Sequence, residues 1–313
     1  MNIYNEEEVQ LKIAISGGTG FIGKALANFL SLKEGYTIYI LTRKKRENPL
    51  NSNIQYIQWD AHSHKFPLSS IDVLVNLAGE SINNGRWTKK QKESIIASRL
   101  HTTNSLIKQL QTLQKKPHTF INASAIGYYG TSETKIFTEQ NKENGSDFLA
   151  ATVKLWEEAA AHATSLGIRT VYTRFGIVLG KDGGALPKML LPYQLFIGGT
   201  IGSGNQWLSW IHLDDAIRMI DFAINTKEIE GPLNITSPNP TTMKEFGKAL
   251  SIVMHRPHWL PVPAFALHAL LGEMSMLVLQ GQHVLPNKAI QYGYQYSFPT
   301  LNHALQNILS HTL

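Results

Sequence analysis

The chain has 313 residues, of which 43% are hydrophobic and 17% charged, and this composition excludes an intrinsically disordered protein. It contains no cysteine, which excludes disulfides, thiolate zinc sites, iron–sulfur clusters and a thiol nucleophile, and favours the reducing cytoplasm. The formal net charge of +6 permits an anionic partner such as a phosphate-bearing cofactor. The lysines and arginines form no basic stripe interleaved with aromatics, so we expect no nucleic-acid partner.

Residues 1–10 are acidic and lack the cationic and apolar regions of a secretory signal, so we predict a disordered N-terminal extension. The most membrane-like stretch, residues 261–281, is interrupted by two prolines, His268 and Glu273, which argues against a membrane span. We therefore expect a cytoplasmic protein with no membrane contact.

From residue 11 to residue 180, short apolar runs alternate with helical patterns. The runs predict buried strands at 11–16, 36–42, 53–59, 72–78, 118–124 and 168–175. The helical patterns cover residues 20–32, 88–114 and 147–166. Strands joined by helical crossovers predict an α/β fold with a Rossmann-type, doubly wound parallel sheet.

Beyond Gly176, glycine-rich loops replace this strict alternation. Residues 209–225 predict a strand end followed by a helix that Asp214 caps, and residues 232–236 predict a strand, so we expect 209–236 to rejoin the sheet. Thr241 or Thr242 is expected to cap the next helix, and residues 256–313 predict two more helices around a Pro-x-Pro break. Residues 181–208 and 237–313 would then form a smaller, mostly helical C-terminal substrate region.

The sequence SGGTGFIG, residues 16–23, lies directly between the first predicted strand and the first predicted helix. Gly17 permits a tight turn, Gly20 lets the backbone approach a pyrophosphate, and Gly23 lets helix and strand pack closely. Because this strand-turn-helix context surrounds the glycines, residues 11–180 are predicted to form a dinucleotide-binding domain.

The end of the second predicted strand indicates which dinucleotide is bound. An acidic residue there would bind the ribose 2′-hydroxyl, but this chain has Thr42 and Arg43 followed by Lys44, Lys45 and Arg46. This cationic run suits a 2′-phosphate and favours NADP(H) over NAD(H). The alternative is a solvated basic turn.

Further motifs carry a family resemblance: NLAGE at 76–80, SAIGYYG at 124–130, IGSGNQWLSWIHLDD at 201–215 and GYQYSFP at 293–299. With the glycine turn, the chain resembles extended short-chain dehydrogenases/reductases. It is most similar to their atypical "epimerase family protein" subfamily among the NAD(P)-dependent epimerase/dehydratases, which has its own small C-terminal domain. The resemblance implies a parallel sheet of about seven strands, NADP(H) binding, and a substrate pocket between the sheet and the C-terminal part.

Matched residue by residue, the resemblance implies cofactor contacts in the glycine turn, at the ends of the second and fourth strands, on the following helix and after the sixth strand. These positions are Gly17, Thr19, Gly20, Phe21, Ile22, Gly23, Thr42, Arg43, Leu77, Ala78, Gly79, Arg99 and Val178.

Reductases of this superfamily use a Tyr and a Lys separated by three residues, and the Lys ammonium lowers the pKa of the phenol. No Tyr in this chain has a Lys at that spacing; the residue at that spacing before Lys154 is Ala150. Candidate replacements at the end of the fifth predicted strand are Ser124, Tyr128 and Tyr129, although the two tyrosines could instead pack the loop against the 147–166 helix. His62 and His64 lack a third ligand at metal spacing, so no metal site is expected.

The run from Leu186 to Phe196 is apolar and flanked by glycines, which is typical of a lid over the nicotinamide or of core packing. A lid of this composition predicts a small-molecule substrate with an apolar part. We therefore predict an NADP(H)-binding oxidoreductase or epimerase acting on a small carbonyl or alcohol. The missing Tyr–Lys pair leaves a second hypothesis, a non-catalytic NADPH-binding redox sensor that binds a protein partner.

Overall fold

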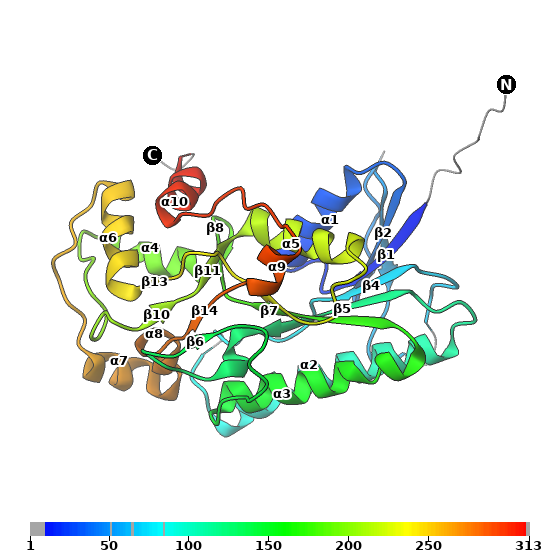
Figure 1. Cartoon of the computed structure of the whole chain (residues 1–313), viewed down its shortest axis with the longest axis horizontal. Coiled ribbons are helices and arrows are strands. Elements are labelled where there is room, and N and C mark those ends of the chain that lie inside the picture. Colours follow the sequence, from blue (N-terminus) through cyan, green and yellow to red (C-terminus); the bar gives the residue numbers. More distant parts are fainter. Residues whose placement is uncertain (1–9, 51, 64–65, 84, 311–313) are drawn as a thin grey trace.

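A computed structural model describes residues 10–50, 52–63, 66–83 and 85–310, so nearly all of the predicted N-terminal extension lies outside the described residues. The centre of the molecule is a seven-stranded parallel sheet in the order β12-β7-β5-β4-β1-β2-β3 (Figure 1). This confirms the predicted α/β fold. The strands are β1 Leu11–Ser16, β2 Tyr36–Thr42, β3 Ile54–Gln58, β4 Val73–Asn76, β5 Thr119–Ala125, β7 Arg169–Phe175 and β12 Gly231–Ile235.

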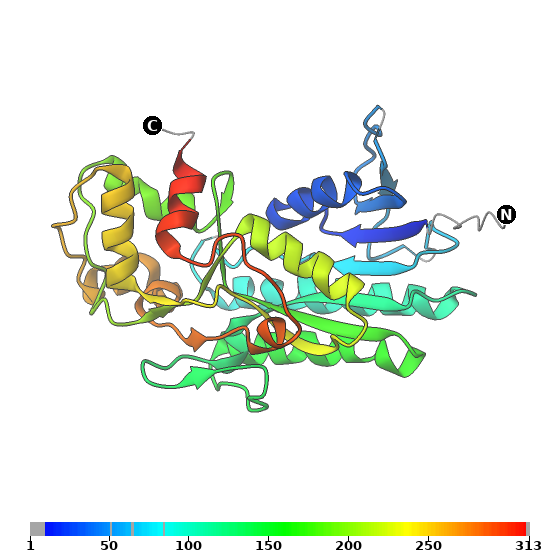
Figure 2. The ribbon, with the colours of Figure 1, turned by 45° about the horizontal axis from the view of Figure 1, so that its top comes forward.

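Helices cover both faces of the sheet, as its apolar runs predict. One face carries α1 (Phe21–Ser31) and α5 (Leu213–Asn225), and the other carries α2 (Lys89–Thr112) and α3 (Phe148–Ala161) (Figures 1 and 2). Successive side chains of β1 point to opposite faces of the sheet and so enter two different hydrophobic cores. Ile13 packs in the core with α1 and α5, whereas Ala14 packs in the core with α2 and α3. The sheet is therefore buried on both sides, and its ligand crevice lies at the carboxyl ends of the strands.

A second core lies in the C-terminal part and contains α4 (Leu186–Gln194), α6 (Met243–Met254) and α10 (Leu301–Leu309). Leu186, Leu190 and Tyr193 of α4 are buried there, so the core-packing interpretation of this run holds for these side chains. The shorter elements are η1 Ile126–Tyr129, β6 Ile136–Phe137, η2 Thr164–Leu166, β8 Ile177–Gly180, β9 Gly183–Gly184, β10 Trp207–Leu208, β11 Trp210–His212, β13 Thr241–Thr242, α7 Ala264–Leu271, η3 Gly272–Ser275, α8 Met276–Leu279, β14 His283–Val284 and α9 Asn287–Gln291.

Two details of the C-terminal half differ from expectation. Only β12 rejoins the main sheet, because β11 pairs in parallel with β8 in a separate small sheet. Within the described residues, the stretch from 256 onward holds four short α-helices rather than two, since Gly272 and Pro286 divide it further. No helix in the described part of the chain combines the length and apolarity that a bilayer crossing needs.

The helix caps were predicted in part. Thr242 caps α6 in a reciprocal capping box with Glu245, as expected. The α5 helix begins instead at His212, whose Nδ1 accepts a hydrogen bond from the backbone N–H of Asp214 at 3.0 Å. Asp214 therefore lies in the first turn, where its charge favours the positive end of the helix dipole.

His212 should make stability depend on pH. Burial lowers its pKa below the usual value near 6.5, although Asp214 and Asp215 oppose the shift, and its ring stacks on Phe298 at 3.9 Å. The folded state then binds fewer protons than the unfolded state, so this contribution is complete above pH 6.5 and is lost as the pH falls through the folded pKa. The variant His212→Asn keeps an oxygen that can cap the helix. We expect its denaturant midpoint to decrease less between pH 7.5 and pH 5 than that of the parent. Equal slopes would contradict this role.

Candidate functional site

The glycine turn lies between β1 and α1 and leaves space only for backbone. Gly17 has a φ of +76°, and a Cβ there would lie 2.6 Å from the carbonyl carbon of Leu77. A Cβ on Gly23 would lie 2.3 Å from the carbonyl oxygen of Gly17. Gly20 caps α1 without a side chain, so the first turn of the helix faces the crevice as an anion site. These features fit a dinucleotide pyrophosphate.

The other turn residues have distinct positions. Thr19 is exposed, and Ile22 is half-buried against the first core. The ring of Phe21 occupies the space beside the β8–β9 glycines, because a Cβ on Gly183 would lie 2.6 Å from its Cδ2 atom. Phe21 thus holds the turn against the C-terminal part of the molecule.

The basic residues follow β2 at the same edge of the sheet. Thr42 ends β2, and its hydroxyl donates to the carbonyl of Lys44 at 3.2 Å, while Arg43 is exposed. Since β2 lies parallel beside β1, the Arg43 position is adjacent to the glycine turn. Asp60, after β3, accepts a hydrogen bond from the backbone N–H of His62 at 2.8 Å and so forms a turn.

The residues after β4 form the floor of the crevice. The backbone N–H of Leu77 donates to the carbonyl of Ser16 at 2.8 Å, and that of Ala78 donates to the Asn76 side chain at 3.3 Å. Asn76 also donates to Asn122 of β5 at 2.8 Å, which joins two strands by a buried side-chain bond. Sequence reasoning missed Asn122, because a single polar residue in an apolar run carries no local signal.

Arg99 of α2 lies where the resemblance implied. Its guanidinium stacks over the Trp156 ring at 5.0 Å, and Gly79 leaves space beside its side chain. Burial lowers the pKa of Arg99 to about 10, although Glu80 opposes the shift. A largely buried cation therefore lies at the boundary between the nucleotide crevice and the cavity beside it. Val178, the remaining predicted contact, is buried on β8 opposite Ile211.

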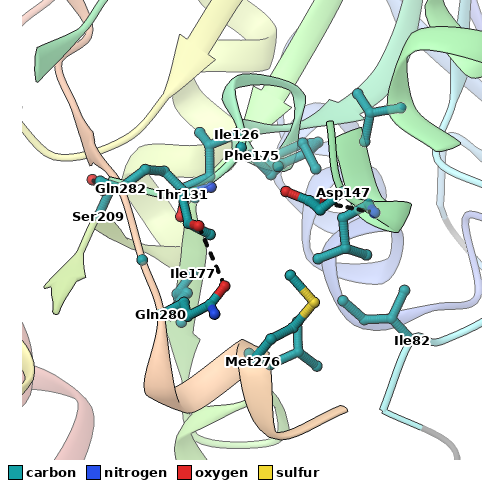
Figure 3. A pocket seen from close by; sticks show the side chains of 18 of the residues that line it. Ile82, Ile126, Thr131, Asp147, Phe175, Ile177, Ser209, Met276, Gln280 and Gln282 are labelled. Carbon is teal, nitrogen blue, oxygen red and sulfur yellow. Dashed lines mark hydrogen bonds between the residues drawn. The ribbon is translucent and has the colours of Figure 1, made fainter. Parts of the chain in front are cut away.

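A cavity of about 270 Å³ adjoins the carboxyl ends of β5 and β7. Its walls are mostly apolar and include Ile82, Ile177 and Met276. In Figure 3, Asp147 and Ile82 lie on one side and Thr131, Gln280 and Ser209 on the other. The remaining lining residues with polar side-chain atoms are Arg99, Thr152, Trp156, Trp207 and Gln282.

Asp147 is the carboxylate in this wall. One oxygen caps α3 by accepting from the backbone N–H groups of Leu149 at 2.8 Å and Ala150 at 3.0 Å. Opposite it, the Thr131 hydroxyl donates to Gln280 at 3.3 Å. Sequence reasoning missed this group, because Gln280 lies more than 100 residues from Thr131 and Asp147 in the chain and the three share no motif.

The three predicted catalytic hydroxyls have partners elsewhere. Ser124 donates to Glu157 at 2.5 Å, Tyr128 to the carbonyl of Lys142 at 2.7 Å, and Tyr129 to Asn234 at 2.8 Å. None of these hydroxyl-bearing residues lines the cavity, whose wall instead includes Ala125. Their catalytic role stays a prediction, and the contacts favour the alternative that the tyrosines pack this loop.

Beneath the loop lies a buried ion pair that sequence reasoning missed. Arg174 of β7 binds Glu157 of α3 through two hydrogen bonds, of 2.8 and 2.7 Å. Burial lowers the pKa of Arg174, but the hydrogen bonds and the charge of Glu157, together with Tyr129, outweigh burial and raise the pKa overall. The guanidinium lies 3.5 Å from the centre of the Tyr128 ring, so the pair supports the loop that carries the cavity wall.

The other candidates lie apart from this site. Ala150 is buried on α3, and Lys154 on the same helix is exposed. His62 stacks on His101 at 4.2 Å, and His64 lies outside the described residues. Among the residues that the structure describes, no group of three or more His, Asp or Glu could hold a metal ion.

The sheet, the glycine turn and the adjoining cavity define a dinucleotide-binding protein of the doubly wound class. The profile of the NAD dependent epimerase/dehydratase family matches residues 13–236, and that of a Domain of unknown function (DUF1731) matches residues 262–308. The chain belongs to the NAD dependent epimerase/dehydratase family.

Individual relatives agree with this assignment. The chain is 48% identical to "Epimerase family protein YfhF" of Bacillus subtilis, over 96% of this chain and 98% of that protein. The crystal structure of human epimerase family protein SDR39U1 with NADPH is 34% identical and superposes with a TM-score of 0.86, covering 97% of this chain and all of that one (100%). A UDP-glucuronic acid 4-epimerase from Bacillus cereus shares the fold at 19% identity, with a TM-score of 0.77 and coverage of 96% and 98%.

Proposed function

We propose that this protein is an NADP(H)-dependent oxidoreductase or epimerase acting on a small carbonyl or alcohol. The main support is that the glycine turn and the cavity lie along the same edge of one sheet, with the cavity at the carboxyl ends of β5 and β7. When bound, the cofactor supplies or accepts a hydride at the nicotinamide. The chain supplies binding, orientation and exclusion of water.

The preference for NADP(H) over NAD(H) is proposed from the residues at the end of β2. Arg43 follows β2 beside the glycine turn, and the acidic residue that would repel a 2′-phosphate is absent from that position. The NADPH present in the human relative's structure supports this choice.

Arg43→Ala should weaken NADPH binding by about tenfold or more, because a charge-assisted hydrogen bond contributes about 1.5–3 kcal/mol. NADH binding should be unchanged, since NADH has no 2′-phosphate. Energy transfer from tryptophan to the reduced nicotinamide measures both affinities. Arg46→Ala is the matched control: Arg46 lies over the Tyr56 ring, so its loss should leave the preference in place. Equal affinities for both nucleotides in the parent would refute the assignment.

The cavity accounts for substrate binding in this proposal. Its apolar wall, with Ile82, Ile177 and Met276, suits a substrate with an apolar part. Asp147 is placed to accept a hydrogen bond from a substrate hydroxyl through the oxygen that does not cap α3. Thr131 and Gln280 offer donors and acceptors on the other side.

A second candidate is a non-catalytic NADPH-binding redox sensor. It is favoured by Ala150, which stands at the position of the usual Tyr, four residues before the exposed Lys154. NADPH oxidation across a panel of small aldehydes and ketones separates the two. Met276→Trp should fill the cavity without changing the affinity for NADPH. If the parent oxidises NADPH with a member of the panel and this variant does not, the result supports the enzyme hypothesis. Tight NADPH binding without turnover on any member of the panel supports the sensor.

A further inference from the structure

An exposed apolar cluster lies on the loop that follows α4 and the loop between α6 and α7. These three helices lie at one end of the molecule (Figures 1 and 2). We call it the apolar tip and define it as Leu195, Phe196, Ile197 and Trp259. Their exposed fractions are 58%, 54%, 44% and 63%. Single exposed apolar side chains are common, but four that meet on two adjoining loops indicate a binding surface.

The two loops of the tip are held together. The Trp259 indole N–H donates to the carbonyl of Phe196 at 2.9 Å, and its backbone N–H donates to the carbonyl of Gly198 at 2.9 Å. One residue further, the backbone N–H of Leu260 donates to the same Gly198 carbonyl at 3.1 Å. The apolar side chains are therefore displayed on a fixed backbone.

Phe196 occupies a backbone position that glycine would suit better. Its φ is +61°, and it follows α4 in a cap where its N–H donates to the carbonyl of Tyr193 and that of Ile197 donates to the carbonyl of Pro192. A bulky residue with positive φ is strained, and its side chain is half exposed. A half-exposed ring at a strained backbone position indicates a role in contact with a partner.

Positive charge lies next to the tip. The Arg256 guanidinium lies 4.6 Å from the centre of the Phe196 ring. Burial and then the charge of Lys248 lower the pKa of His258, the residue before Trp259, so Lys248 also lies nearby. The loops that carry the tip, residues 195–200 and 255–263, contain no Asp or Glu, and Glu245 lies in the capping box at the start of α6. An apolar surface with adjoining cations suits a partner with an apolar interior and an anionic face.

We propose that the apolar tip inserts into the headgroup region of an anionic lipid surface. A tryptophan at the boundary of apolar and polar groups, apolar side chains on a protruding loop, and nearby cations are the features that such a surface selects. A second copy of the chain is disfavoured as the occupant, because a symmetric contact would bring the Arg256 and Lys248 side chains of both copies together. The proposal departs from the expectation of no membrane contact, which depended on the interrupted stretch at 261–281, because contact with a lipid surface needs no spanning helix. It is independent of the proposed reaction.

Sedimentation with lipid vesicles tests this proposal in the full chain. We expect binding to vesicles of mixed phosphatidylcholine and phosphatidylglycerol that exceeds binding to pure phosphatidylcholine and falls at high salt. Phe196→Gly should weaken it about tenfold by removing the inserted ring. This variant should fold, because glycine relieves the positive φ. Leu32→Ser is the matched control, since Leu32 is 85% exposed at the end of α1, outside the tip.

The same tryptophan-to-nicotinamide titration shows that each variant keeps its fold and nucleotide site. Three results would overturn the proposal: no sedimentation with the mixed vesicles above a lipid-free sample, equal losses in Phe196→Gly and Leu32→Ser, or a lipid-free dimer that Phe196→Gly dissociates. The last result would assign the tip to a second copy of the chain.

Discussion

Glu157→Ala is expected to lower the free energy of unfolding by about 3–5 kcal/mol, because it leaves Arg174 buried without its counter-charge. The side chains of Glu157 and Arg174 are only 10% and 4% exposed, so water cannot replace the lost hydrogen bonds. The same change removes the acceptor of the Ser124 hydroxyl. Denaturant unfolding followed by tryptophan fluorescence measures the loss.

Two further variants show whether the effect comes from the unpaired charge. Glu157→Leu combined with Arg174→Met should recover most of the stability, since an apolar pair of similar volume removes both charges together. Lys115→Ala is the control: Lys115 is 75% exposed in its 3.3 Å ion pair with Asp72, and its loss should cost about 0–1 kcal/mol. If Glu157→Ala cost no more than Lys115→Ala, the buried pair would not stabilise this fold.

The position of the pair connects stability to the site. Ser124 and Arg174 are register partners in adjacent strands, and the Arg174 guanidinium faces the rings of Tyr128 and Tyr129 in the loop after β5. That loop supplies Ile126 to the cavity wall. Tyr129 is also fixed by its buried bond to Asn234. These contacts favour a supporting role for Ser124, Tyr128 and Tyr129 at the cavity wall, and their catalytic role stays a prediction.

The fold was largely predictable because parallel strands covered on both faces are apolar throughout. The run at 118–124 predicted β5 within one residue, and the glycines at 16–23 predicted the strand-turn-helix unit, since both signals are local. Trp210 and Ile211 are apolar as well, but the pairing of β11 with β8 rather than with the main sheet depends on contacts that no local pattern encodes.

The candidate site likewise has a part that local sequence predicts and a part that it does not. The glycine turn and Arg43 lie within one strand-helix-strand unit, so their spacing predicted the nucleotide crevice. The cavity combines Asp147, Thr131 and Gln280, which only the folded chain brings together. The cap of α5 could not be predicted from the sequence for a different reason. His212 and Asp214 both lie at the start of this helix, and both side chains can accept a hydrogen bond. Only the folded geometry shows that His212 is the cap.

Gly23→Ala is expected to weaken NADPH binding by about 10- to 100-fold. Gly23 lies in α1, where alanine forms helix better than glycine by about 1 kcal/mol, so propensity alone predicts a stabilised protein. The added Cβ would lie 2.3 Å from the carbonyl oxygen of Gly17 and 2.7 Å from the Cα of Gly18. Both are backbone atoms of the phosphate turn, so the turn must move.

Overpacking of this kind costs about 1–3 kcal/mol, and a displaced turn transfers that cost to the bound nucleotide. Asn28→Ala is the control, because Asn28 is exposed on the same helix and away from the turn, and it should leave NADPH affinity unchanged. NADPH and NADH affinities should fall together in Gly23→Ala, unlike Arg43→Ala, since both dinucleotides share the pyrophosphate. Parent-like affinity for both nucleotides in Gly23→Ala would mean that the pyrophosphate does not bind at this turn.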